Sequence, residues 1–217
     1  NAHGVLIGDY IYSKAFILMV EIGETGILQE LANATNDISK GELIQLDALH
    51  NTRIGIEDLK AISYFKTGRL FEASAKTGAM LAGGDKSFVN NISKCAKYLG
   101  ILFQIKDDLL DYSLDEKIIG KPVFQDMKEG KVTYPFYFAY NNSDKKNKEK
   151  LKSYLGKNKF NINSAYKLID QLGGIIETEH LAFEYLEKAK KSANSIKNKH
   201  IKEEMLKLVD SALYRKK

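Results

Sequence analysis

Apolar residues recur every three or four positions along most of this chain, which is the spacing of amphipathic α-helices. Glycine pairs such as Gly83-Gly84 and clusters of charge separate the periodic stretches. We find no alternation of apolar and polar residues of the kind that forms strands. The pattern therefore predicts an all-α fold, an antiparallel helical bundle. Helices are expected over residues 5–22, 24–49, 58–83, 87–112, 132–140, 166–173, 175–193 and 201–213.

Two segments lack this periodicity. Residues 114–131 hold glycines, a proline and mixed charge, and we expect them to form a loop. Residues 141–165 are polar and should be an exposed connection with a short helix. A chain of 217 residues is long enough for one domain with its own core. We therefore predict a single all-α domain over residues 1–217.

The helix predicted over residues 87–112 carries a stripe of polar residues, and its other faces are mostly apolar. Gln104, Asp107, Asp108 and Asp111 fall within an arc about a quarter-turn wide, and apolar residues cover most of the rest. A helix that is apolar on most sides is usually buried. Buried carboxylates must be paired, protonated or bound to a cation. A cluster of acids therefore favours a hard divalent ion such as Mg²⁺, which shares its coordination with phosphates.

The spacing within the stripe assigns provisional roles. Asp107 and Asp111 are four residues apart, so their carboxylates could hold one Mg²⁺ between them, with Asp108 beside them. Gln104 lies one turn earlier and could orient a water or phosphate oxygen, or could instead cap a buried acid. An ordinary solvated acidic face is the alternative for the whole stripe.

Three lysines could bind a phosphate group. Lys66 lies between Ile62 and Leu70 at helical spacing, so it should point along the edge of the core, paired with an anion or extended along the helix surface. Lys121 and Lys131 lie in the loop that follows the acidic helix. They could close over phosphates, although loop lysines are commonly just solvated.

Net charge and cysteine content limit the classes of function that the chain could have. The net charge is +5, and residues 141–217 hold 18 basic residues against 10 acids. These lysines are dispersed among glutamates with almost no arginine, which favours a solvated surface over a nucleic-acid site. The single cysteine, Cys95, fits a buried position and a reducing, cytoplasmic compartment. We find no apolar run long enough for a transmembrane helix, and no histidine spacing typical of zinc sites.

Several motifs occur in a fixed order. They are LIGDYIYSKA (6–15), GELIQL (41–46), Lys66-Thr67, FQIKDDLLDY (103–112), Gly120-Lys121, the D-x-x-E-G-K-x-T-x-P run from Asp126 to Pro135, and GGIIETEHLAFEYLEKA (173–189). Together they resemble the trans-isoprenyl diphosphate synthases, or polyprenyl synthetases, and lean toward the medium- and long-chain, octaprenyl-like type.

The chain departs from that family's pattern in two ways. Phe124 stands where the family usually has glycine, so the sequence leaves the local loop geometry open. The family's first aspartate-rich motif does not occur in these residues. Because that motif normally precedes the GDYIYSKA segment, we expect the domain to be N-terminally incomplete in this sequence.

The resemblance implies a fold, a reaction and roles for residues. The fold would be the isoprenoid synthase bundle around a central cavity, in a homodimer. The reaction would condense isopentenyl diphosphate with an allylic prenyl diphosphate and release diphosphate, with three Mg²⁺ ions in the complete enzyme. Peripheral membrane contact could aid product release. The implied residues are Asp107, Asp108 and Asp111 for metal, Lys66, Lys121 and Lys131 for diphosphate, and Lys66, Thr67 and Gln104 for catalysis.

Two alternatives share this fold. A terpene cyclase would begin with the same ionisation, but its N/D-D-x-x-S/T-x-x-x-E signature is matched only in spacing by Asp107, Asp108, Asp111 and Asp115. A non-catalytic subunit of a heteromeric prenyl synthase is compatible with the residues present. Nucleic-acid binding through residues 141–217 ranks third, since arginine and aromatic readers are lacking there.

Overall fold

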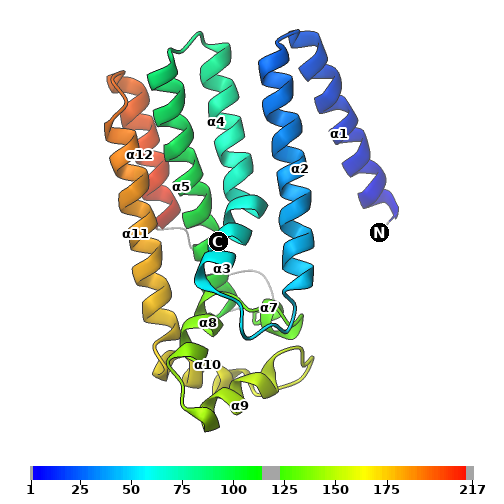
Figure 1. The fold of residues 1–217 in the computed structure, drawn as a ribbon, viewed down its shortest axis with the longest axis vertical. Coiled ribbons are helices and arrows are strands. Elements are labelled where there is room, and N and C mark those ends of the chain that lie inside the picture. Colours follow the sequence, from blue (N-terminus) through cyan, green and yellow to red (C-terminus); the bar gives the residue numbers. More distant parts are fainter. Residues whose placement is uncertain (1, 114–122, 214–217) are drawn as a thin grey trace.

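The computed structural model of the chain describes residues 2–113 and 123–213. Long helices stand side by side along the long axis of the molecule (Figure 1). Shorter helices gather at the end where α3 and α7–α10 lie (Figure 1). The described residues contain helices and turns and no strand, so the predicted all-α class is confirmed. The long helices are α1 (Ala2–Ile22), α2 (Thr25–Asp47), α4 (Arg69–Leu81), α5 (Lys86–Asp111), α11 (Gly174–Asn194) and α12 (Lys199–Leu213).

The shorter elements refine the sequence prediction. The helix expected over 58–83 is three elements in succession, α3 (Ile56–Ser63), a π-helical turn η1 (Tyr64–Gly68) and α4. A four-residue helix, α7 (Gln125–Lys128), lies in the predicted loop. The predicted polar connection holds α9 (Lys145–Tyr154) and the first turn of α10 (Ile162–Gln171). Helix α8 (Tyr134–Asn141) has Pro135 in its first turn, as expected.

Local chemistry explains where several helices begin. The Asp85 carboxylate accepts the backbone N–H of Phe88 at 2.7 Å and caps α5. Asp144 and Asn161 cap α9 and α10 in the same way. Such caps satisfy backbone donors that the helix itself leaves unpaired.

Helix α5 is the central element of the bundle. It packs against α4 on one side and α11 on the other. Its apolar positions Leu102 and Ile105 are fully buried, and the core continues into Tyr112, Phe124 and Phe136 at the end that carries the short helices. The apolar surroundings predicted for the acidic stripe are therefore present.

Helix α1 differs from the others because its main contact is with α2 alone (Figure 1). It is apolar on several sides, and its large side chains remain exposed, among them Leu6 at 66%, Tyr10 at 71% and Ile11 at 62%. Helices that are apolar all round are normally covered. None of the described helices is long and apolar enough to cross a bilayer.

Two glycines set the distance between η1 and α5. A Cβ on Gly100 would lie 2.7 Å from the Gly68 Cα, closer than real Cβ atoms approach other atoms. The two backbones therefore meet without a side chain between them. This contact brings the residues of η1 against the acidic stripe of α5.

Gly100→Ala should destabilise the fold by about 1–3 kcal/mol, because the added methyl forces the two backbones apart. Gly78 is the matched control, since it also lies within a helix and its Cβ would meet nothing within 4 Å. Gly78→Ala should stabilise by about 0.5–1 kcal/mol through helix propensity. Urea denaturation of both variants measures these changes, and equal effects would contradict the close approach.

Candidate active site

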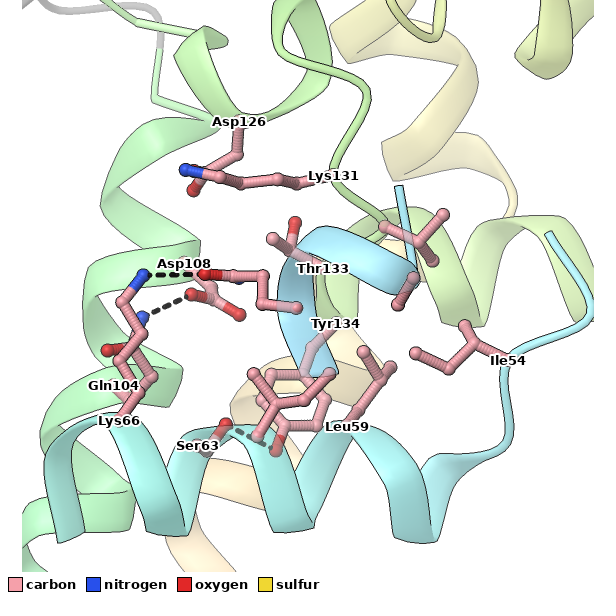
Figure 2. Close-up of a pocket in the computed structure, with 14 residues that line it drawn as sticks. Ile54, Leu59, Ser63, Lys66, Gln104, Asp108, Asp126, Lys131, Thr133 and Tyr134 are labelled. Atoms are coloured by element: carbon pink, nitrogen blue, oxygen red, sulfur yellow. Dashed lines mark hydrogen bonds and ion pairs between the residues drawn. The ribbon is translucent and has the colours of Figure 1, made fainter. Parts of the chain in front are cut away.

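A pocket opens between α3 and η1, the acidic stripe of α5, and the segment from α7 to α8 (Figure 2). The space that water can enter within it is small, about 20 Å³. Ile54, Leu59 and Ile62 supply apolar lining. The polar lining comes mainly from Lys66, Gln104, Asp108, Asp126 and Lys131. The cavity expected beside the acidic stripe is therefore present, and it brings together residues far apart in the sequence.

A chain of hydrogen bonds links η1 to the acidic stripe. The Thr67 hydroxyl donates to Gln104 Oε1 at 2.8 Å. Gln104 Nε2 donates to Asp108 Oδ1 at 2.9 Å (Figure 2). Of the two roles left open for Gln104, the structure shows the partner of a buried acid. The same amide also fixes the orientation of Thr67.

Asp108 is the carboxylate of the α5 stripe that lines the pocket. It is buried, with 5% of its surface exposed. Burial, followed by the nearby charge of Asp126, raises the pKa of Asp108 to about 8. In the absence of a cation this carboxyl holds its proton near neutral pH. A divalent ion at the pocket would favour the ionised form.

The spacing of the stripe predicts that Asp111 faces the cavity with Asp107, but the structure places Asp111 against α7. Its two carboxylate oxygens accept the backbone N–H groups of Gln125 at 3.0 Å and Asp126 at 3.1 Å. These donors open α7, so a buried Asp111 anchors that helix to the end of α5. Asp107 is half-buried, and its charge also raises the pKa of Asp108. Metal binding by these acids stays a prediction.

Two of the three predicted lysines reach the pocket. Lys66 Nζ donates to Gln45 Oε1 of α2 at 3.0 Å. Lys131 Nζ lies 3.3 Å from Asp126 Oδ1 and 2.6 Å from Glu129 Oε2. Figure 2 shows Lys131 and Asp126 together above Asp108. Lys121 lies outside the described residues.

Sequence reasoning gave no role to three residues of this pocket. Gln45 comes from the GELIQL segment and fixes Lys66. Asp126 comes from the D-x-x-E-G-K run and pairs with Lys131. Tyr134 shares a hydrogen bond of 2.9 Å with Ser63 and closes the wall between α8 and α3. The motifs that held these residues were the available signal, but their roles depend on contacts between distant segments.

Phe124 has a backbone conformation that favours glycine, the residue that the family usually has at this position. Its φ is +58°, in the left-handed region that favours glycine. Its ring is fully buried and lies 5.0 Å from Tyr112 and 6.0 Å from Phe160 between ring centroids. Aromatic packing thus offsets the backbone strain that a glycine would avoid.

The donor set suits magnesium in a specific way. Within residues 2–113 and 123–213, no group of three or more His, Cys, Asp or Glu side chains could by itself hold a metal ion. Mg²⁺, however, usually takes one or two carboxylates and completes its shell with waters and substrate phosphates. The buried Asp108 facing the pocket and the half-buried Asp107 beside it fit that pattern.

The fold and pocket define an all-α protein whose buried acids and lysines suit a metal-bound phosphate. Residues 1–172 match the sequence profile of the Polyprenyl synthetase family. The chain belongs to that family, as its motifs predicted.

The relatives agree in sequence and in fold. Octaprenyl diphosphate synthase of Escherichia coli K12 is 33% identical over 191 residues, an alignment that covers 87% of this chain and 59% of that protein. A polyprenyl synthase from Caulobacter crescentus CB15, crystallised with calcium and isoprenyl diphosphate, superimposes with a TM-score of 0.92 at 32% identity, covering 100% of this chain and 67% of that one. Octaprenyl pyrophosphate synthase from Helicobacter pylori gives a TM-score of 0.86 at 32% identity, covering 99% and 68%.

Asp108→Asn should change how stability depends on pH. The folded-state pKa of about 8 lies above the ordinary value of 3.8, so the folded protein binds this proton more tightly than the unfolded chain. The stability that this group contributes is complete below about pH 4 and is lost as the pH rises toward 8. In EDTA, the unfolding free energy of the unaltered protein should therefore fall across that range relative to Asp108→Asn. Urea denaturation measures it, and parallel pH profiles would contradict the buried acid.

Proposed function

We propose that the full-length protein is a prenyltransferase. It condenses isopentenyl diphosphate with an allylic prenyl diphosphate, releases diphosphate and makes a trans-polyprenyl diphosphate of medium or long chain. The observation that supports the proposal is the pocket. Asp108, Lys66 and Lys131 line it together, beside apolar residues. The similarity to octaprenyl diphosphate synthases supports it.

In this proposal the chain's own residues bind and orient the diphosphate. Mg²⁺ held by Asp107 and Asp108 would neutralise the charge of the leaving group. Asp111, which the sequence also proposed as a ligand, would instead support the site by anchoring α7. Lys66, Lys131 and Lys121 contribute positive charge to the same group, which is electrostatic stabilisation of the charge that develops on ionisation. Gln45 holds Lys66 at the pocket, so little reorganisation is needed.

In this proposal Gln104, at the pocket, and Thr67, bonded to it, would be the polar groups that stabilise the reacting carbon. Their mutual hydrogen bond and the bond from Gln104 to Asp108 fix both side chains. The apolar wall of Ile54, Leu59 and Ile62 excludes water from the reaction. A cationic intermediate is thereby protected from hydrolysis.

The proposal extends to the oligomeric state and the cellular compartment. A homodimer is favoured because the large apolar side chains of α1 remain exposed. A reducing, cytoplasmic compartment fits the buried, free Cys95 thiol. Transient peripheral membrane contact would deliver a product whose tail is too apolar for water.

The direct test of the proposed reaction incubates full-length protein and Mg²⁺ with isopentenyl diphosphate and either farnesyl or geranylgeranyl diphosphate. Elongated prenyl diphosphates and free diphosphate are expected by chromatography. Cyclised hydrocarbon formed from the allylic substrate alone would favour a terpene cyclase. A protein that is inert alone but active with a second chain would be a subunit of a heteromeric synthase.

Asp107→Ala tests the acidic stripe separately. Turnover should fall at least about 100-fold, because the charge of the leaving group loses its compensation. Asp170→Ala, at an exposed position of α10, is the matched control and should keep full turnover. Circular dichroism should show unchanged helicity in both variants. An Asp107→Ala enzyme with normal turnover would remove Asp107 from the metal site.

A further inference from the structure

His50 has an unusual backbone conformation in the connection between α2 and α3. Its φ is +60°, and within the described part of the chain only Phe124 is another non-glycine residue with positive φ. This conformation costs free energy for residues other than glycine, so the surroundings must maintain it. His50 has no part in the chemistry described above.

The imidazole ring of His50 packs against two glycines from different segments. Gly130 follows α7, and Gly156 follows α9. A Cβ at either glycine would overlap the His50 ring, and both glycines have positive φ, +84° and +75°. The ring therefore occupies space that only glycine leaves open on both sides. Although His50 is an exposed residue, its ring joins three separate connections of the fold.

Backbone hydrogen bonds fix the same arrangement. The His50 N–H donates to the carbonyl of Gly130 at 2.7 Å, and the Gly156 N–H donates to the carbonyl of Met127 at 2.8 Å. Met127 belongs to α7 and is fully buried. The turn that contains Gly130 is thus held by His50 on one side and by the Gly156 segment on the other.

This turn leads directly into the pocket. Gly130 precedes Lys131, whose ammonium lies beside Asp126 at the pocket (Figure 2). Val132, Thr133 and Tyr134 continue the pocket wall. Displacing Gly130 would therefore move the backbone that carries Lys131.

We infer that His50 is a positioning residue, which sets the place of Lys131 at the pocket by packing its ring between Gly130 and Gly156. The inference rests on the proposed function, because it takes Lys131 to contact the substrate diphosphate. His50 itself does not touch the substrate. A purely stabilising contact would change the unfolding temperature without acting through Lys131, so the two roles are separable.

The test measures the affinity of full-length protein for inorganic diphosphate in Mg²⁺ by calorimetry. His50→Asn removes the ring but keeps a residue that tolerates positive φ, and His50→Gly is a second variant with the same property. His200→Asn, at an exposed position of α12, is the matched control. Either His50 variant should weaken binding about tenfold, because a shift of the Lys131 backbone weakens a charge-assisted hydrogen bond to diphosphate. His200→Asn should bind as the unaltered protein does.

A double-mutant cycle with Lys131→Ala decides how His50 acts. Lys131→Ala should weaken diphosphate binding, and its effect should be smaller in the His50→Asn background, since the two residues act through one contact. Additive effects, or unchanged affinity in both His50 variants, would overturn the positioning role while Lys131 keeps its own. If Lys131→Ala leaves the affinity unchanged, the proposed diphosphate contact of Lys131 fails, and the His50 inference fails with it.

Discussion

A buried carboxyl group at Asp108 is the constraint on which the rest of the site depends. An ionised carboxylate in such a place is costly unless hydrogen bonds or cations compensate it. The structure supplies one hydrogen bond, donated by the Gln104 amide, and the nearby charge of Lys66. Burial outweighs both and raises the pKa of Asp108 to about 8. A divalent cation that enters the pocket would supply the remaining compensation for the ionised form. The protein thus holds an acid whose ionised form is favoured by a divalent cation.

The fold builds this site from two close contacts and a π-helical turn. Gly68 and Gly100 let η1 approach α5, so Thr67 reaches Gln104 across 37 residues of sequence. Insertion of a π-helical turn is rare and frequently marks functional sites; here it carries Lys66 and Thr67. Asp111 binds the first backbone N–H groups of α7 and so places Asp126 over the pocket. Each contact moves a polar group toward the same cavity.

The sequence predicted the long helices because each carries a continuous apolar face, and it predicted the pocket because an acidic stripe in an oily helix needs a cation. It could not reveal η1, since the π-helical turn arises where the chain packs between α2 and α5. Nor could helical spacing separate Asp108, which faces the pocket, from Asp111, which faces the α7 backbone. An arc about a quarter-turn wide includes both positions. The contacts of Gln45, His50 and Asp126 likewise join segments whose proximity no local pattern encodes.

The central claim is that the acids of α5 hold a divalent cation together with a diphosphate. A crystal of the full-length protein grown with Mn²⁺ and inorganic diphosphate tests it most directly, because the anomalous scattering of Mn²⁺ locates the ion. The account predicts an anomalous peak within coordination distance of the Asp107 or Asp108 carboxylate, bridged to a diphosphate oxygen. Diphosphate bound in the pocket with the metal remote from both carboxylates would contradict it.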